Sequence, residues 1–542
     1  MAYTMDGHSM SLKLNTHAIS DDWISSLLEK NITLDTSKLE VDKFSTPETV
    51  VDIVYHDSNI VSNARRIANE LITLACKTSP KSHKVYKKSS AEVYKLIRAR
   101  KTEEALAKCN IALLNANHDK LELCYAFENR SAAFFEMNRF NDSLYDIEAA
   151  ITCNYPPDEL HHDILPRRIR CLAALNQTEQ LHQELASINK LTSLFPKNTE
   201  YKSLASLTAS LLAKLKKSSS NVIQEDKSYI KLCALFTEIE LNENSLVENA
   251  TAAVKIEFDY AKGRLLRSTH DIEIESDIVR EEALVSILFD EHQATKCHNC
   301  LITVNERFIP CKNCTQARYC SFQCQQEHHL KHSQCCKYFE LTKNWSLFSL
   351  VGQLLILKRN ETSKQMDSYS RLPFINYLYS KWYGTAHARN FHGVSSLSPT
   401  LPLVKKHSLA LAVEAYLMAR CLQHLDKEAF ADVKERDLVN EIFKLLLIIE
   451  CCKIKFIERD QNSRIYSYGI GVFATYSLLN HSCDANCRFI TFGNQVYVQS
   501  TKDILAGEEL TINYGVNEGA IAERQKYLKE NFGFICKCNL CS

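Results

Sequence analysis

Residues 469–487 read GIGVFATYSLLNHSCDANC, and residues 507–515 read GEELTINYG. Both segments fall in a strand-rich region that we predict at about residues 465–515, after a long helical stretch at about 340–457. The first segment gathers amide, imidazole, hydroxyl and thiol side chains within a few residues, and the second ends with Tyr514 and Gly515. Taken alone, Tyr514 could equally be a core tyrosine, so its meaning depends on the rest of the chain.

The composition is that of a globular protein with several domains. The chain has 542 residues, enough for about three or four domains, and its 65 Lys and Arg balance its 65 Asp and Glu. This balance disfavours a generally basic nucleic-acid binder. The first residues (MAYTMDGHSMSLKL) lack the apolar core of a secretory signal, and no apolar run is long enough for a membrane span. We expect an intracellular protein, cytoplasmic and nuclear, in which the 22 cysteines are reduced and clustered ones bind metal.

Residues 297–336, called the finger below, carry metal-ligating side chains in pairs. The pairs are Cys297-x2-Cys300, Cys311-x2-Cys314, Cys320-x3-Cys324 and His332-x3-Cys336. Eight ligands suffice for two tetrahedral zinc sites, and so small a module should depend on zinc for its folding. Cys335 could compete with Cys336 as a ligand. His328 and His329 are out of register, and we expect them on the surface of the last helix.

Residues 91–190 show a repeat-like helical pattern. The best copy runs from Ala126 to Pro156, with poorer copies at Ala91 to Leu114 and Leu165 to Leu185. The alternation of small and large apolar residues resembles the tetratricopeptide repeat, a helix–turn–helix unit whose stacks bind peptides. A plain helical bundle is the alternative.

The remaining segments give weaker signals. Within residues 1–75 we expect helices at Asp22 to Glu29 and Ser62 to Ala75, with no function assigned. Lys77 to Ser90 (KTSPKSHKVYKKSS) has the composition of a solvated linker or a weak nuclear localisation signal. Lys214 to Asn221 is a second linker or a helix end. Strand-like alternation occurs at Ile272 to Glu275 and at Ala283 to Phe289.

The finger resembles the MYND zinc finger at all eight ligand positions. The resemblance implies an interleaved arrangement, with Cys297, Cys300, Cys320 and Cys324 on one ion and Cys311, Cys314, His332 and Cys336 on the other. It also implies docking of short Pro-containing peptides.

The two segments quoted first resemble the signature segments of SET-domain lysine methyltransferases, which cross in a pseudoknot beside the cofactor. The ending Cys536-x-Cys538-x2-Cys541 resembles the post-SET zinc site, for which family precedent supplies Cys483 as the fourth ligand, so three zinc ions are expected. Ala261 to Arg267 (AKGRLLR) looks like the opening SET strand. A finger inserted after that strand is the layout of the SET and MYND domain family, and the N-terminal repeats are most similar to its fourth-member subgroup.

The predicted architecture is α+β and multidomain. Its parts are an N-terminal segment and linker (1–90), tetratricopeptide-like helical repeats (91–215), the first part of the SET core (250–296), the MYND finger (297–336), a helical insert (337–460), the rest of the β-rich SET core (461–520) and a post-SET zinc clamp (521–542).

The resemblance implies methyl transfer from S-adenosylmethionine to a lysine of a histone or another protein, with the finger and repeats recruiting substrates or co-regulators in transcriptional regulation. Tyr514 matches the catalytic tyrosine, which orients the amine and the methyl group. The cofactor-binding positions are Gly263, Arg264, Ser477, Leu478, Leu479, Asn480, His481, Tyr514, Phe532 and Phe534. The amine must be neutral to attack, and a dry channel lowers the pKa of a lysine.

Three positions depart from the family pattern. Leu265 replaces the second glycine of the opening Gly-x-Gly, where a side chain could obstruct the cofactor. Ala485 replaces a proline, and Cys452 aligns with an asparagine often found near the cofactor. A catalytically weak or inactive SET and MYND adaptor or co-repressor scaffold is therefore the alternative function. A DNA binder is disfavoured because the chain lacks a strong basic surface.

Overall fold

A computed structural model of the chain describes residues 47–75, 81–217, 247–368, 394 and 405–542, except for 120, 158, 161, 260–261, 305, 339–340, 342–344, 461–463 and 517–518. The expected helix at Asp22 to Glu29 and residues 218–221 of the second linker lie outside these ranges. The chain forms two compact units. We call residues 79–238 with 303–325 the repeat unit, and residues 1–78 with 239–302 and 326–542 the β unit. No described helix is long and apolar enough to cross a membrane.

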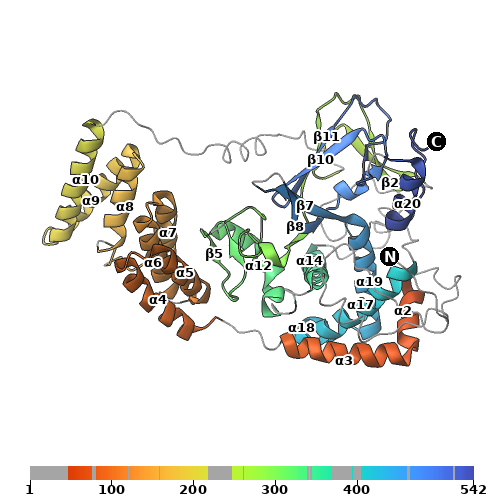
Figure 1. Cartoon of the computed structure of the whole chain (residues 1–542), viewed down its shortest axis with the longest axis horizontal. Coiled ribbons are helices and arrows are strands. Elements are labelled where there is room, and N and C mark those ends of the chain that lie inside the picture. The colour runs from red at the N-terminus through yellow and green to blue at the C-terminus, as the bar shows by residue number, and fades with distance from the viewer. Residues whose placement is uncertain are drawn as a thin grey trace. The chain divides into compact units, whose positions relative to one another are not determined.

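The repeat unit is built from helices that pack in order along the chain (Figure 1). Its helices are α4 (His83–Arg98), α5 (Thr102–Asn115), α6 (Glu122–Glu136), α7 (Phe140–Thr152), α8 (Ile164–Ala174), α9 (Thr178–Leu194) and α10 (Thr199–Lys217). Each helix packs on the next, and α4, α6, α8 and α10 also contact along their own row. This is the contact pattern of stacked helical hairpins.

The hairpin turns repeat at a fixed spacing. Arg100, Asn138 and Asn176 have positive φ values of 57°, 58° and 56° and end the first helix of successive hairpins. Asparagine tolerates this left-handed conformation better than most side chains. The spacing is 38 residues both from 100 to 138 and from 138 to 176. It exceeds the 34 residues typical of the tetratricopeptide repeat, so the hairpins are longer than that unit.

The boundary at residue 90 differs from the expectation. Helix α4 begins at His83, inside the stretch Lys77 to Ser90 that looked like a linker. The Ser82 hydroxyl caps it by accepting a hydrogen bond from the Val85 N–H at 3.3 Å, and Lys81 Nζ donates to the Ala116 carbonyl at 3.0 Å. The lysine-rich composition concealed one buried face, where Tyr86 and Val93 pack into the unit.

Residues 303–325 of the finger, called the finger loop below, pack on α6–α7, the middle hairpin of the repeat unit. Arg130 on α6 is fully buried and holds Asp146 on α7 through two hydrogen bonds of 2.7 Å. Its guanidinium also donates to the carbonyls of Glu306 at 2.8 Å and Phe308 at 2.9 Å in the finger. Tyr145 on α7 donates to the Cys320 carbonyl at 2.7 Å. The α6–α7 hairpin is therefore occupied by the chain's own finger.

The β unit contains several small sheets. Its strands are β1 (Val254–Asp259), β2 (Gly263–Ser268), β3 (Asp277–Glu282), β4 (Val285–Leu288), β7 (Lys453–Arg459), β8 (Ile465–Val472), β9 (Asn480–His481), β10 (Cys487–Phe492), β11 (Gln495–Ser500) and β12 (Thr511–Ile512). The sheets have the orders β10-β11-β3, β4-β8-β7, β1-β2 and β12-β9. Only the pair β9 and β12 is parallel among these.

Three details of this unit bear on the predictions. The strand at Val285–Leu288 is confirmed, but Ile272 to Glu275 forms only an isolated bridge from Ile272 to Ile504, because Glu275 turns the chain with a φ of 65°. The predicted helical stretch ends at Cys452, and strand β7 follows at once. The strand-rich region at 465–515 is confirmed by β8 to β12.

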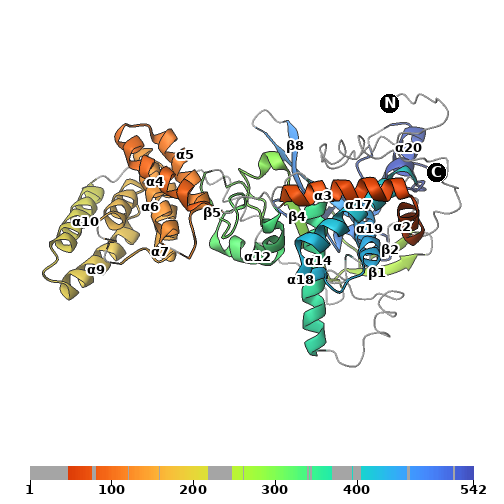
Figure 2. The same cartoon turned by 90° about the horizontal axis from the view of Figure 1, so that it is seen from below.

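Helices α2 (Pro47–His56) and α3 (Ser58–Ala75) pack on the helical insert of the β unit (Figures 1 and 2). The insert consists of α14 (Ser346–Ser368), α17 (Lys405–Leu425), α18 (Lys427–Phe430) and α19 (Glu435–Cys452). Arg65 Nε donates to the Tyr416 hydroxyl at 3.2 Å, and the Tyr55 and Tyr416 rings meet edge to face at 5.5 Å. The helix predicted at Ser62 to Ala75 is thus confirmed, and it contributes Ile67 and Leu71 to the core of this unit.

The finger itself has little regular structure. It contains the short strands β5 (Ile309–Pro310) and β6 (Arg318–Tyr319) and ends in helix α12 (Phe322–Lys337). A module of this size with so little regular structure generally depends on metal for its folding.

Candidate active site and metal centres

The two signature segments cross at the parallel pair β9 and β12. Asn480 lies opposite Thr511, and His481 lies opposite Ile512. Asn486 fastens the crossing from the side, because its Oδ1 accepts from the Thr511 N–H and its Nδ2 donates to the Glu509 carbonyl, both at 2.8 Å. The crossing brings segments about 30 residues apart in sequence into register, as the resemblance implied.

Tyr514 follows β12 and lies over the end of the first segment. Its hydroxyl donates to the Leu479 carbonyl at 2.7 Å, and its N–H donates to Nδ1 of His481 at 3.1 Å. Burial raises the pKa of Tyr514 well above its usual range, so the hydroxyl keeps its proton at neutral pH. Tyr514 can therefore orient a ligand through a fixed hydroxyl, and it is not a phenolate base.

His481 connects this tyrosine to the post-SET cysteines. Burial lowers its pKa to about 4, so the imidazole is neutral at neutral pH. Since Nδ1 accepts from the Tyr514 N–H, the proton of the neutral ring is assigned to Nε2, which lies 3.3 Å from the Cys483 sulfur. One ring therefore contacts both the tyrosine segment and a candidate zinc ligand.

Aromatic side chains from the C-terminal part close around Tyr514. Helix α20 (Ile521–Phe532) ends at Phe532, whose ring lies 4.8 Å from that of Tyr514. Gly533 then reverses the chain with a φ of 78°, a conformation that favours glycine. The Phe534 ring consequently lies 6.4 Å from Tyr514 and 6.0 Å from His481. Both predicted phenylalanines thus reach the tyrosine.

The opening segment also reaches this region. Strand β2 packs against the 3-10 turn η4 (Tyr476–Leu478), which carries Ser477 and Leu478 of the predicted cofactor set. Arg264 on β2 lies near Cys452 at the end of α19, and burial lowers its pKa. Burial raises the pKa of the Cys452 thiol to about 11, while the neighbouring Ser477 opposes this. Cys452 therefore lies beside Arg264 and Ser477, two positions of the predicted cofactor set.

The positions that depart from the family pattern have different surroundings. Leu265 is fully buried and sits opposite Glu257 in the antiparallel pair β1 and β2. At Gly263, which has a φ of 78°, an added Cβ would meet no atom within 4 Å. Space next to the opening strand is thus present at Gly263, whereas the Leu265 side chain is enclosed by protein.

Asn480 has a partner that the motif did not reveal. Its Nδ2 donates to Glu509 Oε1 at 3.0 Å, and Lys262 forms a salt bridge with the other oxygen of that carboxylate. Glu509 and Asn486 both belong to the two signature segments, and the resemblance implies no role for either residue. A pattern of residue types carries no signal for such cross-segment hydrogen bonds, because the partners lie 23 to 29 residues apart.

The post-SET cysteines form one cluster. Cys483, Cys536, Cys538 and Cys541 place their sulfur atoms within 4.8 Å of one another. The sulfurs of Cys483 and Cys541 are 3.5 Å apart. Four thiolates in this arrangement suit a structural zinc ion. Cys483, which family precedent had supplied, is therefore brought to the three C-terminal cysteines.

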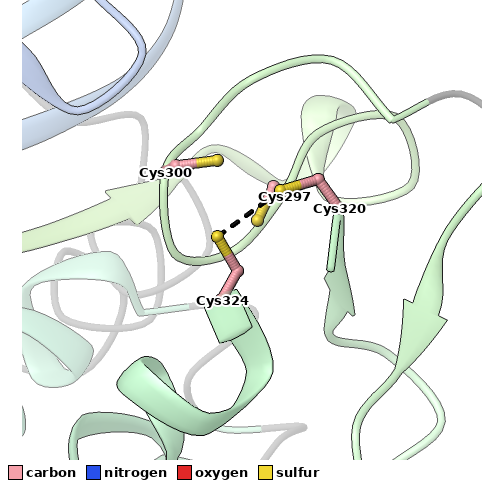
Figure 3. Close-up of side chains that lie close together, drawn as sticks. All are labelled: Cys297, Cys300, Cys320 and Cys324. Carbon is pink, nitrogen blue, oxygen red and sulfur yellow. Dashed lines mark hydrogen bonds between the residues drawn. The ribbon is translucent and has the colours of Figure 1, made fainter. Parts of the chain in front are cut away.

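The finger ligands form two further clusters, interleaved as the resemblance implied. Cys297, Cys300, Cys320 and Cys324 form one, with their sulfur atoms pointing toward one another (Figure 3), and Cys311, Cys314, His332 and Cys336 form the other. The ligand atoms within each cluster lie within 4.8 Å of one another. Cysteine and histidine ligands in sets of four fit zinc.

One expectation for the finger is wrong. His328 is only 6 % exposed, and its ring stacks on that of His332 at 5.5 Å, one helical turn away on α12. The spacing of four residues places both rings on one face of the helix, so His328 packs beside a metal ligand. His329, on another face, is exposed as expected.

Comparisons with known proteins agree with this site. The SET domain family matches residues 263–515. The human "Protein-lysine N-methyltransferase SMYD4" is 25 % identical over 619 residues, covering 96 % of this chain and 74 % of its own length. The mouse "Histone-lysine N-methyltransferase SMYD3" is 26 % identical over 283 residues, covering 52 % of this chain and 59 % of its own.

Among solved structures, "Crystal structure of the SET domain of LSMT bound to Lysine and AdoHcy" covers 57 % of this chain and 56 % of its own, with 14 % identity and a TM-score of 0.27. A likeness this distant adds nothing to the argument. The SET domain match therefore spans both crossing segments, and the similarity to SMYD4 extends along almost the whole chain.

Proposed function

We propose that this chain is a protein-lysine N-methyltransferase that transfers a methyl group from S-adenosylmethionine to a lysine side chain of another protein. The observation that carries the proposal is the fixed Tyr514 hydroxyl, held on the Leu479 carbonyl at the crossing of the two SET segments. The names of the SMYD4 and SMYD3 relatives support the same activity.

The residues around Tyr514 suit this cofactor. Gly263 leaves room for close backbone approach, the Asn480 side chain offers amide hydrogen bonds, and the rings of His481, Phe532 and Phe534 offer walls. When bound, S-adenosylmethionine supplies a methyl group on a good leaving group. The protein must then align the amine and keep it neutral.

The aromatic residues would contribute to the second task. Rings packed around Tyr514 exclude water, and a lysine ammonium in such surroundings loses its proton more readily. The Tyr514 hydroxyl, already fixed by Leu479, can accept a hydrogen bond from the amine and orient its lone pair toward the methyl group.

A non-catalytic scaffold is the second candidate. Two observations favour it: Leu265 puts a buried side chain on the opening strand, and Cys452 replaces an amide side chain beside Arg264 with a thiol. In this case the zinc clusters and the crossing would persist as a stable frame for partners without methyl transfer.

Titration calorimetry separates the two candidates. S-adenosylmethionine is titrated into full-length protein after metal analysis has confirmed three zinc ions per chain, one for each cluster. We expect a dissociation constant in the micromolar range, about −8 kcal/mol. Absence of binding by folded, fully metallated protein would favour the scaffold.

Tyr514→Phe then tests the catalytic role. This variant loses the bond to Leu479 and the contact with the amine, so we expect methyl transfer to fall by about a hundredfold or more while folding and partner binding persist. Tyr466→Phe is the control, because its hydroxyl donates to Glu458 at 2.6 Å and not to the cofactor segment. Undiminished methyl transfer by Tyr514→Phe would contradict the assigned role.

Recruitment through the finger and the repeats belongs to the same proposal. The substrates would be histones or other proteins, and co-regulator peptides would bind the finger or the hairpins that the finger loop leaves open, in the cytoplasm and nucleus. The finger loop on Arg130 occupies the α6–α7 hairpin, so a peptide site on the repeats is expected on α8 to α10. Peptide binding by variants in α8–α10 tests this.

A further inference from the structure

Glu281 is a fully buried carboxylate in the β unit. It lies on β3, opposite Val496 of β11. Its side chain accepts hydrogen bonds from three consecutive backbone amides. Oε1 accepts from Ala474 at 2.8 Å and from Thr475 at 3.1 Å, and Oε2 accepts from Thr475 at 3.1 Å and from Tyr476 at 2.8 Å.

These amides open the turn that carries the predicted cofactor residues. The first N–H groups of a helical turn have no acceptor within the turn and need one from outside. Thr475, the N-cap of η4, supplies no side-chain cap, because its hydroxyl donates to the Glu248 carbonyl at 2.9 Å. The Glu281 carboxylate fills that role from another strand, and charge-assisted bonds of this kind are stronger than neutral ones.

The 3-10 turn η4 is hydrogen-bonded to Tyr514. The N–H groups of Leu478 and Leu479 donate back to Thr475 and Tyr476 at 3.0 Å, so the turn is closed. The carbonyl of Leu479 leaves the turn at its far end and accepts from the Tyr514 hydroxyl at 2.7 Å. A continuous series of hydrogen bonds therefore runs from Glu281 through η4 to the tyrosine.

We infer that Glu281 is a positioning residue, which fixes the backbone of residues 474–479 so that this segment and Tyr514 are preorganised for S-adenosylmethionine. The inference rests on the proposed function, since it assigns the cofactor to this segment. It adds a residue outside both signature segments, on a strand about 190 residues upstream of the amides it holds.

Glu281→Gln is the sharpest variant because it preserves the shape of the side chain. Each carboxylate oxygen accepts two bonds, so whichever way the amide turns, its NH₂ group faces two backbone donors. Glu282→Gln is the matched control on the next residue. Glu282 accepts from Asn494 Nδ2 at 2.9 Å, and a glutamine oxygen can still accept that bond.

Two measurements on zinc-replete, full-length protein test the inference. Hydrogen exchange should be at least about tenfold faster at the amides of residues 474–476 in Glu281→Gln, and calorimetry should show S-adenosylmethionine binding weakened by at least about tenfold. Glu282→Gln should match the wild type in both. If Glu281 contributed only to overall stability, Glu281→Gln would have a lower melting temperature. Its affinity for S-adenosylmethionine, measured well below that temperature, would match that of the wild type. Wild-type affinity and exchange in Glu281→Gln would overturn the inference.

Glu281→Asp covers the case in which Glu281→Gln does not fold. It keeps both oxygens and the charge but is shorter by one methylene group, so we expect intermediate exchange and affinity. A folded Glu281→Asp with wild-type values for both would overturn the inference. Failure of the proposed function is distinguishable: wild-type protein would then bind no S-adenosylmethionine, while faster exchange at 474–476 in the Glu281 variants would still show the positioning of the segment.

Discussion

The finger and the post-SET end solve the same coordination problem in different ways. All eight finger ligands come from 40 consecutive residues, in pairs two or three residues apart. The post-SET cluster takes three ligands from residues 536–541 and the fourth from Cys483, which is 53 residues before Cys536. The finger clusters need only a local chain path, whereas the post-SET cluster needs the folded crossing.

Because of this difference, the zinc ions of the two regions are expected to have different structural roles. In the finger, zinc supplies the free energy that a small module lacks, and Arg130 fixes the loop to its hairpin. At the post-SET end, zinc joins the C-terminal residues to Cys483, whose neighbour His481 contacts Tyr514. Loss of zinc should therefore unfold the first region and loosen the active site in the second.

The largest effect is expected from Cys314→Ser in the finger. Removing one thiolate opens a buried cluster, and structural zinc contributes about 10–16 kcal/mol of apparent binding free energy to the folding of such modules. Metal analysis should find at most two of the three expected ions, and limited proteolysis should cut within residues 303–325. Cys153→Ser, a half-buried thiol outside the clusters, serves as control. Retention of three ions by Cys314→Ser would contradict the ligand assignment.

The next effect concerns the attachment of the finger loop. Arg130→Met leaves the buried Asp146 without its cation and the carbonyls of Glu306 and Phe308 without their donor. Breaking a buried ion pair from one side typically costs about 3–5 kcal/mol, so denaturant unfolding of the repeat unit should shift by that amount. A double change with Asp146→Leu should recover part of the loss.

Arg139→Met provides the matched comparison. Arg139, on the same hairpin, pairs with Asp142 of α7 and with Glu306 of the finger, but its side chain is 31 % exposed. Exposed pairs contribute about 0–1 kcal/mol, so this variant should be much milder. Equal destabilisation by the two arginine variants would show that burial of Arg130 does not decide the strength of the attachment.

Cys538→Ser tests the opposite side of the comparison. We expect one zinc ion fewer and S-adenosylmethionine binding weakened by about tenfold or more, because the residues that carry Phe532 and Phe534 lose their anchor at Cys483. The unfolding of the repeat unit should stay unchanged. Calorimetry and metal analysis measure both effects, and unaltered affinity in the variant with two ions would separate the clamp from the cofactor site.

The sequence was most informative where ligands or motifs are local. The finger pairs, the α+β architecture and the helix at Ser62–Ala75 could be predicted because spacing and periodicity are properties of a short stretch. Family resemblance extended this to the crossing and to Cys483. The predicted domain boundary at residue 90 differs from the observed start of α4 at His83 for a related reason. Lysines on the exposed face of α4 give the segment the composition of a linker, although Tyr86 and Val93 are buried.

The interactions that no pattern revealed are between distant segments. Arg130 and Glu281 are both fully buried charges, one satisfied by a carboxylate and carbonyls and the other by backbone amides. Their partners lie 16 to about 195 residues away. A charged residue in a helix or strand is more often exposed, so only the folded chain distinguishes these two from the many surface charges.

The smallest effect on stability is expected at Ala485, which replaces the family proline two residues after Cys483. Ala485 precedes the buried Asn486, and no hydrogen bond recorded for the described residues uses the Ala485 N–H, while its carbonyl accepts from Thr501. Proline would therefore remove no bond, and it would restrict the unfolded chain. Ala485→Pro should stabilise the β unit by about 0.4–1 kcal/mol, measured by denaturant unfolding.

The same variant should also hold Cys483 and Asn486 more rigidly. The post-SET zinc should therefore be removed by a chelator more slowly than in the wild type, while the finger ions leave at the wild-type rate. Destabilisation by Ala485→Pro would show that the backbone at Ala485 has a conformation that proline cannot adopt. The turn would then differ in conformation from the proline-containing turn of the family pattern.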